Sequence, residues 1–360
     1  MSTLLTPTKL KNIRDRSYAT KDIRQKYNLV EGDGDTTPRT YILLRKTKKT
    51  FMAAYQNVIV AGASGNMGPA ILKALNTAKF TVSVLSREGS SHQFPPFVKV
   101  YKTDYSLPSL SEAFRGQDAV VSVVGALGIL NQIQMIDAAS QVGVRRFLPS
   151  SFGADLDDKE GMQPNFLGLM GNKLRVQEHL VKVCEENKTL TWTQLVTGPI
   201  LDWALLDAPV AMGFDIKAKA ATIYDSGNAP VTCTPRPQIG IAVANSLKNP
   251  EATANRSLRT VSLEITQNKL LAALEQETGG ERWAVTRVST KDSVASGLEK
   301  IAAKNFGGAF VNILAAQMYE DGTTRSRICT PEASDNTLLG VEVLDLGEYV
   351  ADIVKQVSAK

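Results

Sequence analysis

The sequence predicts an α/β fold, a doubly wound parallel Rossmann sheet with a smaller C-terminal substrate lobe. Short apolar runs alternate with helical patterns between Asn57 and Val196, and repeated β-α units form a parallel sheet with helices on both faces. A glycine-rich turn directly follows the first apolar run. The alternation weakens after about residue 198, which indicates that a second lobe begins there.

The first expected strand, residues 58–62, is an unbroken apolar run, as in strands buried on both faces. Glycines then recur with the spacing G-x-x-G-x-x-G, and an apolar helix starts at Pro69. Backbone N–H groups at such a helix start bind a pyrophosphate, and glycine lets the backbone approach it. A plain structural turn is the alternative. The candidate cofactor-binding residues of this turn are Gly62, Ser64, Gly65, Asn66, Met67 and Gly68.

The remaining elements follow the same alternation. Further strands are expected at 81–86, 98–103, 118–124, 146–150 and 190–196, and helices at 68–78, 106–115, 130–142 and 168–187. Later helices are expected at 262–276, 291–304 and 344–356. We therefore expect residues 52–200 to form an NAD(P)-binding Rossmann domain. Residues 201–360, with returning segments, would form a smaller substrate-binding lobe over the carboxyl ends of the strands, where such sheets bind ligands.

The ends of three strands carry further candidates for cofactor contacts. The second ends at Ser86 and Arg87; a basic residue here pairs with a 2′-phosphate, which favours NADPH, although Arg87 could instead be a solvated surface cation. At the end of the third strand, Asp104 could meet the adenine. At the end of the fourth strand, Gly125 would let the cofactor lie against the backbone. Ordinary loop starts are the alternative for both.

Composition narrows the functional classes. The net charge is +5, but residues 1–51 hold 12 Lys and Arg against 5 Asp and Glu, and the remainder holds 29 against 31. A near-neutral body predicts no nucleic-acid partner. No apolar run approaches the ~20 residues that span a bilayer, so no membrane partner is expected. Three scattered cysteines and two histidines predict no metal site. We expect a monomer or homodimer.

Residues 1–51 differ from the rest of the chain. They are basic, lack a sustained apolar period and contain a cluster of turn residues at 31–38. We expect a disordered extension, or upstream sequence wrongly joined to the gene, since Met52 is a plausible start. An organelle presequence is the alternative, because residues 16–19 resemble a processing site, although Asp15 and Asp22 count against it. The expected location is cytoplasmic, or mitochondrial if this segment is a presequence.

A segment after the fifth strand carries a family resemblance. Residues 143–154 resemble the G-V-K-R-F-L-P-S-E-F-G stretch of the isoflavone reductase-like family, in the NmrA-like branch of the atypical short-chain dehydrogenases. The resemblance covers residues 56–358. The residues in its motifs resemble those of fungal members more than those of plant members. The motifs fall in the family's order at residues 62–68, 86–87, 132–139, 146–153, 173–175, 191–199 and 225–230.

The resemblance implies a reductase that uses NADPH on aromatic, phenylpropanoid-like, isoflavone-like or quinone-like small molecules. It also implies that Lys173 is the catalytic lysine and that Phe152, with Pro149 and Ser150, lies along the nicotinamide. Residue 169 is Leu, so the Tyr-x-x-x-Lys pair of classical short-chain dehydrogenases is missing. Lysine, water or the substrate must then handle the proton. A surface lysine paired with a carboxylate such as Glu178 is the alternative.

Two departures limit what the resemblance carries over. Ser151 stands where plant members have glutamate, and Gln238 stands where the family has aspartate. Both can alter the substrate pocket. Tryptophans 192, 203 and 283 are expected to be core residues, and Trp203, at the start of the second lobe, is the one that could instead meet a substrate. NmrA-like proteins also include dinucleotide-sensing regulatory proteins without turnover, which is the alternative function. The retained Lys173 favours an enzyme.

Overall fold

The structure is a computed structural model that describes residues 27–31, 41–45 and 54–359. The chain divides into two compact units, residues 1–53 and 54–360. In the first, β1 (Tyr27–Glu31) pairs antiparallel with β2 (Tyr41–Arg45). The rest of the predicted extension, including the possible processing site, lies outside the described residues.

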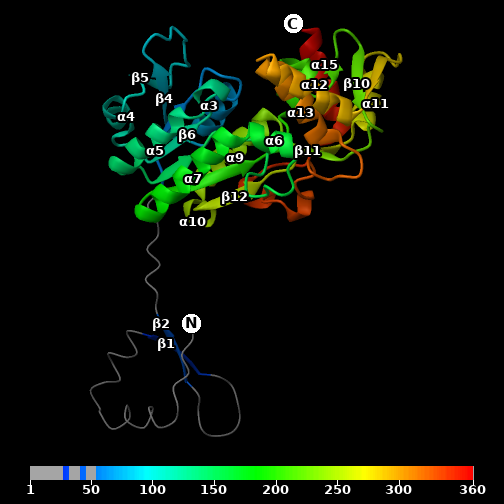
Figure 1. Ribbon diagram of the computed structural model, residues 1–360. Coiled ribbons are helices and arrows are strands. Elements are labelled where there is room, and N and C mark those ends of the chain that lie inside the picture. The colour runs from blue at the N-terminus through cyan, green and yellow to red at the C-terminus, as the bar shows by residue number, and fades with distance from the viewer. Residues whose placement is uncertain (1–26, 32–40, 46–53, 360) are drawn as a thin grey trace, which may run out of the picture. The chain divides into compact units, whose positions relative to one another are not determined.

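The second unit contains a seven-stranded parallel sheet, which confirms the predicted α/β fold (Figure 1). Its strand order is β12-β8-β7-β6-β3-β4-β5. The order reverses beside β3, since the chain first moves outward through β4 and β5 and then returns through β6. The strands are β3 (Asn57–Ala61), β4 (Thr81–Arg87), β5 (Lys99–Thr103), β6 (Ala119–Ser122), β7 (Arg146–Leu148), β8 (Thr191–Val196) and β12 (Arg256–Arg259).

Helices cover both faces of this sheet. One face packs against α4 (Leu107–Phe114), α5 (Asn131–Gln141) and α7 (Gly171–Glu186), whose apolar residues share a core with β3, β6 and β7. Right-handed crossovers place α3 (Gly68–Thr77) on the opposite face. There it packs on α9 (Arg236–Lys248), where Gly240 lies so near the Ala70 carbonyl that a Cβ would be 2.7 Å away.

One strand of the sheet was not predicted. All six expected strands form, but β12 adds a seventh by pairing parallel with β8. Its sequence, Arg-Ser-Leu-Arg, is short and begins and ends with a charge, so it lacks the apolar run that marked its neighbours. An edge strand pairs on one side only, and such polar strands are common there. The second half of the chain therefore returns to complete the sheet.

The C-terminal lobe has its own core, which gathers residues from Leu201 to Ile353. The helix expected at 262–276 was wrong at its start, because residues 263–265 form a strand and Thr266 caps the helix that follows. Helices expected at 291–304 and 344–356 form close to those positions. The other elements in this half of the chain are β9 (Phe214–Asp215), β10 (Ala220–Tyr224), β11 (Val231–Cys233), β13 (Leu263–Ile265), β14 (Ala284–Val288), α8 (Leu201–Leu206), α11 (Gln267–Glu277), α12 (Thr290–Ala302), α13 (Phe306–Tyr319), α14 (Asn336–Leu339) and α15 (Leu346–Ser358).

Two further short helices are α6 (Pro164–Leu169), directly before α7, and α10 (Pro250–Thr253), directly before β12. Among the described residues, no helix is both long and apolar enough to cross a membrane.

Candidate active site

The glycine turn after β3 requires glycine at two positions. Gly62 has a φ of +84°, and a Cβ there would lie 2.8 Å from the backbone of Val123. A Cβ on Gly68 would lie 1.8 Å from the Ala63 carbonyl oxygen. The turn is closed by a hydrogen bond of 3.0 Å from the Gly65 N–H to the Gly62 carbonyl. The two outer glycines thus let the chain turn tightly from β3 into α3.

The N-terminus of α3 is open to a ligand. Met67 occupies the N-cap position without a side-chain hydrogen bond to the helix, so no side chain caps the first turn. Ser64, Gly65 and Asn66 are exposed in front of it. The first backbone N–H groups of a helix lack partners inside it and carry partial positive charge, so an anion such as a pyrophosphate is favoured at this point.

The carboxyl ends of β4 and β5 lie beside this turn in the sheet order. Ser86 is buried and Arg87 is exposed. Arg87 is close enough to Tyr105 to act electrostatically on its hydroxyl, whose pKa is nevertheless raised by burial. The Asp104 carboxylate accepts a hydrogen bond of 2.8 Å from the Ser106 N–H, and hydrogen bonding to Ser106 lowers the pKa of Asp104. Asp104 therefore also has a local turn-forming role.

Gly125, two residues after the buried Val123, leads into a short 3-10 helix, Ala126–Gly128. Its φ of −72° is ordinary for any residue. A Cβ there would meet no atom within 4 Å. None of the residues that the structure describes therefore demands glycine here, and the space beside the Gly125 backbone is free for a ligand.

Hydrogen bonds fix the segment after β7. The Ser150 hydroxyl donates to the Val124 carbonyl at 2.9 Å, and its N–H donates to the Gln132 side chain at 2.7 Å. Pro149 is buried beside it. These contacts tie the ends of β6 and β7 to α5. They position Phe152, whose carbonyl accepts a hydrogen bond of 3.1 Å from Nζ of Lys173.

Lys173 lies in the first turn of α7 and its side chain is partly buried. Desolvation by the surrounding chain lowers the pKa of Lys173 to about 8. The alternative of an ion pair with Glu178 was wrong, since Glu178 pairs instead with Lys159 at 3.4 Å. A lysine with a pKa near neutrality can both hold and release a proton at physiological pH.

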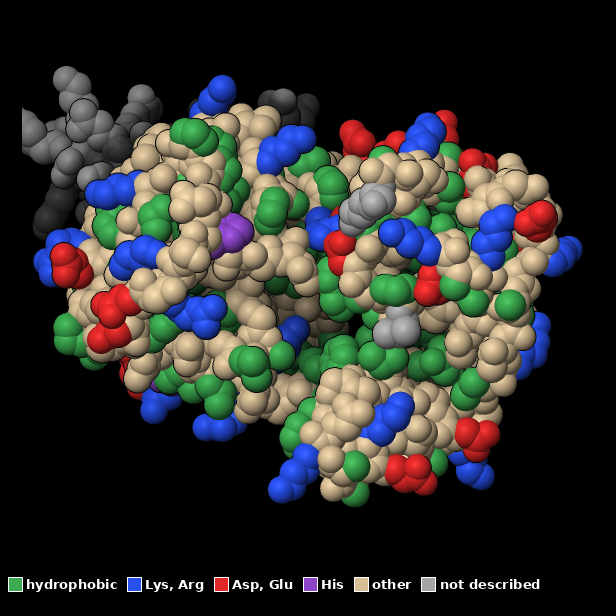
Figure 2. Space-filling view, turned by 90° about the horizontal axis from the view of Figure 1, so that it is seen from above, with side chains coloured by type: hydrophobic (Ala, Val, Ile, Leu, Met, Phe, Trp, Pro, Cys, Tyr) green, Lys and Arg blue, Asp and Glu red, His purple; other side chains and the backbone are tan. Residues whose placement is uncertain are grey.

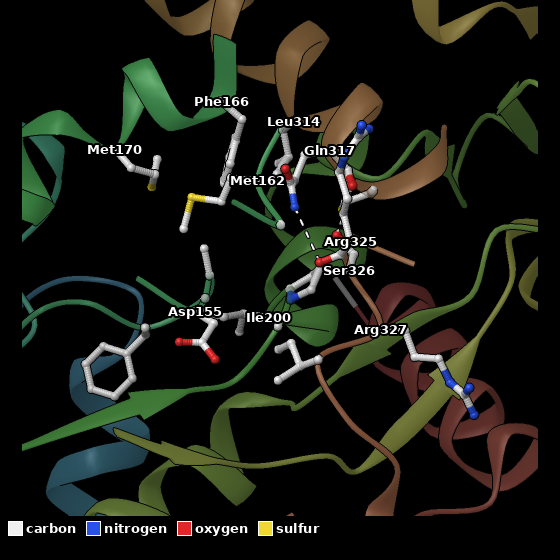
Figure 3. A pocket seen from close by; sticks show the side chains of 18 of the residues that line it. Asp155, Met162, Phe166, Met170, Ile200, Leu314, Gln317, Arg325, Ser326 and Arg327 are labelled. Carbon is white, nitrogen blue, oxygen red and sulfur yellow. Dashed lines mark hydrogen bonds between the residues drawn. The ribbon is translucent and has the colours of Figure 1, made fainter. Parts of the chain in front are cut away.

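A cavity of about 410 Å³ joins Phe152 and Lys173 to the C-terminal lobe. Figure 2 shows a hollow between the two halves of this unit, with hydrophobic side chains around it. The cavity is mainly apolar, as expected for a small-molecule site. Trp203 lines it. Its other large apolar side chains include Met162, Phe166, Met170, Met212, Phe310, Leu314 and Met318, several of which appear in Figure 3.

Apart from Lys173, the charged side chains of the cavity wall were not predicted from the sequence, and most of them are paired. Asp155 accepts from Arg259 on β12 at 2.6 Å. Arg325 pairs with Glu320, and Arg327 pairs with Glu264 at 2.9 Å. Asp155 and Arg327 each pair with a residue that is distant in sequence, so no local motif could have indicated these ion pairs. Pairing leaves these groups little net charge to offer a ligand.

Most of the predicted cofactor-binding residues do not line the cavity. These are the glycine turn, Ser86, Arg87, Asp104, Gly125, Pro149 and Ser150, which follow the ends of the sheet strands. Neither departure from the family pattern lines it: Ser151 is buried, and the Gln238 side chain accepts from the Glu342 N–H at 3.1 Å. In the described part of the chain, no group of three or more His, Cys, Asp or Glu could hold a metal ion.

Comparison with known proteins finds a matching family and similar fungal sequences. Residues 54–295 match the NmrA-like family. Oxidoreductase poxI of Penicillium oxalicum is 37% identical over 296 residues, which cover 82% of this chain and 93% of that protein.

Two solved structures share the fold. AtPrR2 with NADP+ and (+)pinoresinol superposes with a TM-score of 0.68 at 20% identity, covering 84% of this chain and 100% of that one. The complex of leucoanthocyanidin reductase with NADPH, from Vitis vinifera, also has a TM-score of 0.68 at 20% identity, with coverages of 83% and 99%.

Proposed function

The chain belongs to the NmrA-like family, and we propose that it is an NADPH-dependent reductase of aromatic small molecules of phenylpropanoid, isoflavone or quinone type. The observation that carries this proposal is a desolvated lysine on the wall of an apolar cavity. Lys173 has its pKa lowered to about 8 there. The oxidoreductase name of the fungal relative and the reductase names among the structural neighbours support the same reaction class.

The residues at the strand ends fit NADPH. The open N-terminus of α3 suits the pyrophosphate, and exposed Arg87 suits the 2′-phosphate. The free space beside Gly125 suits a ligand lying against the backbone. Asp104 would face the adenine, and Pro149, Ser150 and Phe152 would lie along the nicotinamide. When bound, NADPH supplies a hydride, and the protein supplies position and electrostatics.

Lys173 would manage the proton of the reaction. Its ammonium donates to the Phe152 carbonyl at 3.1 Å, which holds Nζ at the cavity wall. An ammonium has three N–H donors, so it can contact a substrate oxygen while keeping this bond. Protonation of that oxygen would accompany reduction of a conjugated carbon, and the apolar wall would exclude water from the reacting groups.

The pH dependence of the reduction should follow Lys173. The acid form is needed to donate a proton, and the pKa is about 8. We expect log kcat/KM to be level below that pH and to fall by about one unit per pH unit above it. Steady-state rates between pH 6 and pH 10, measured in one buffer mixture, check this. A profile that stays level through pH 9 would exclude Lys173 as the acid.

Arg87 should set the preference for NADPH over NADH. Because its guanidinium would lose a charge-assisted contact with the 2′-phosphate, Arg87→Ala should weaken NADPH binding by about tenfold or more and leave NADH binding unchanged. Calorimetric titration with both cofactors measures this. Arg115→Ala, an exposed arginine at the end of α4, is the matched control. Equal losses for both cofactors would contradict the assignment.

The reductase proposal is tested by the full chain's consumption of NADPH with a panel of quinones, isoflavonoids and phenylpropanoid ethers. Turnover with at least one compound, and its reduced product by mass spectrometry, is the expected result. Tight binding of NADPH without turnover on any compound would favour the dinucleotide-sensing alternative.

A further inference from the structure

Gln317 is a buried amide on the cavity wall, contributed by α13 of the C-terminal lobe. It is 6% exposed. Its Oε1 accepts a hydrogen bond of 2.8 Å from the Gln163 N–H. A backbone N–H can only donate, so this bond identifies Oε1 and leaves Nε2 on the other side of the amide.

The Nε2 group retains donor capacity. It has two N–H bonds, and its hydrogen bond goes to the Arg325 carbonyl at 3.4 Å, which is long for a good N–H···O contact. Figure 3 shows Gln317 beside Arg325 and Ser326 at one side of the cavity. A buried donor without a good partner is unfavourable. A ligand oxygen in the cavity would remove that cost.

Gln317 differs from the other polar groups that line the cavity. The Ser326 side chain is also buried, but its hydroxyl donates to the backbone carbonyl of Gln317 at 3.2 Å. Asp155 has both oxygens engaged, by Arg259 and by the Asp157 N–H. Asp158 is exposed. Among these groups, Gln317 is the buried neutral donor that can still take an acceptor.

We propose that Gln317 is a specificity-determining residue whose Nε2 donates to an uncharged oxygen of the substrate. This inference rests on the proposed function. Lys173 on α7 and Gln317 on α13 line the same cavity from different helices, so they would contact different parts of one molecule. The substrate is therefore an apolar aromatic compound that carries a carbonyl, ether or hydroxyl oxygen in addition to the group that meets Lys173.

An uncharged oxygen fits better than an anion. The side-chain amide of Gln317 has no charge, and the neighbouring Arg325 is paired with Glu320. A site built to donate to an oxygen rejects the analogue that lacks it, because the buried donor is then left unpaired. Gln317 would thus separate oxygenated aromatic compounds from unsubstituted ones of the same shape.

The test compares two probes with one skeleton in the presence of NADP+. trans-Stilbene has no oxygen, and resveratrol has the same skeleton with hydroxyl groups on both rings. Calorimetry gives the ratio of their affinities for the full chain and its variants. Gln317→Met removes the donor and the acceptor. Gln317→Glu keeps an oxygen for the Gln163 N–H but replaces the amide donor. Ser326→Ala is the control on the same wall.

We expect both Gln317 variants to reduce the preference for resveratrol by roughly three- to tenfold, the worth of one hydrogen bond, and Ser326→Ala to retain it. If the preference for resveratrol falls in Gln317→Met but not in Gln317→Glu, Gln317 only anchors residue 163, and the proposal is overturned. An unchanged preference in both variants, or no binding of either probe to the wild type, would also overturn it. Failure of the wild type to bind NADPH would instead overturn the proposed function.

Discussion

Lys173→Met is expected to lower kcat/KM with any reducible compound by about 100-fold or more, the usual contribution of a positioned acid or base. Binding of NADPH should persist, because the residues that fit its phosphates lie at the ends of other elements. The variant removes the ammonium and keeps most of the apolar volume. Steady-state kinetics and cofactor titration, run on the same preparation, measure the two effects separately.

Loss of activity in this variant should not come from unfolding. Burial lowers the pKa of Lys173 from its ordinary value of 10.5 to about 8. Below pH 8 the lysine is protonated in both the folded and the unfolded states, so its desolvation opposes folding there. Lys173→Met should therefore be at least as stable as the wild type at pH 7. Retained turnover, with a normal melting temperature, would show that Lys173 is not the proton donor.

Gly68→Ala is expected to destabilise the fold by about 3 kcal/mol, since overpacking against rigid backbone is among the costlier substitutions. The new Cβ would lie 1.8 Å from the Ala63 carbonyl oxygen. Neither the strand end nor the helix start can move freely, because Ala63 is buried and α3 packs on α9. Chemical unfolding monitored by tryptophan fluorescence measures the change in free energy.

Gly125→Ala is the matched control for that experiment. A Cβ at Gly125 meets nothing within 4 Å, and the φ suits any residue. The free energy of unfolding of this variant should therefore stay within about 0.5 kcal/mol of the wild type. If the free space beside Gly125 receives NADPH, this variant should bind the cofactor more weakly although it folds normally. Equal stability of the two variants would contradict the close approach at Gly68.

The sheet was predictable because its strands follow simple physical rules. Strands such as β3 and β6 are buried on both faces, so their sequences are unbroken apolar runs followed by glycine or polar residues. β12 escaped prediction because an edge strand of four residues with two arginines has no such signal. The return of residues 256–259 to the sheet depends on pairing with β8, which the local sequence does not specify.

The candidate site was predictable only in part. The glycine turn follows from local spacing, whereas the roles of Phe152 and Lys173 came from the family resemblance. The hydrogen bond between residues 163 and 317 joins positions 154 apart in sequence, and the ion pair between Asp155 and Arg259 joins positions 104 apart. Such contacts depend on how the C-terminal lobe meets the sheet. No pattern in either segment indicates its partner.

The proposed transfer of a hydride from NADPH to an aromatic compound can be followed with an isotope. The measurement uses NADPH carrying deuterium at the transferable position of the nicotinamide, with the compound panel and the full chain. We predict that deuterium appears on a carbon of one reduced compound with the wild type, and that this transfer is lost in Lys173→Met. Tight cofactor binding with no deuterium in any panel compound would contradict the claim.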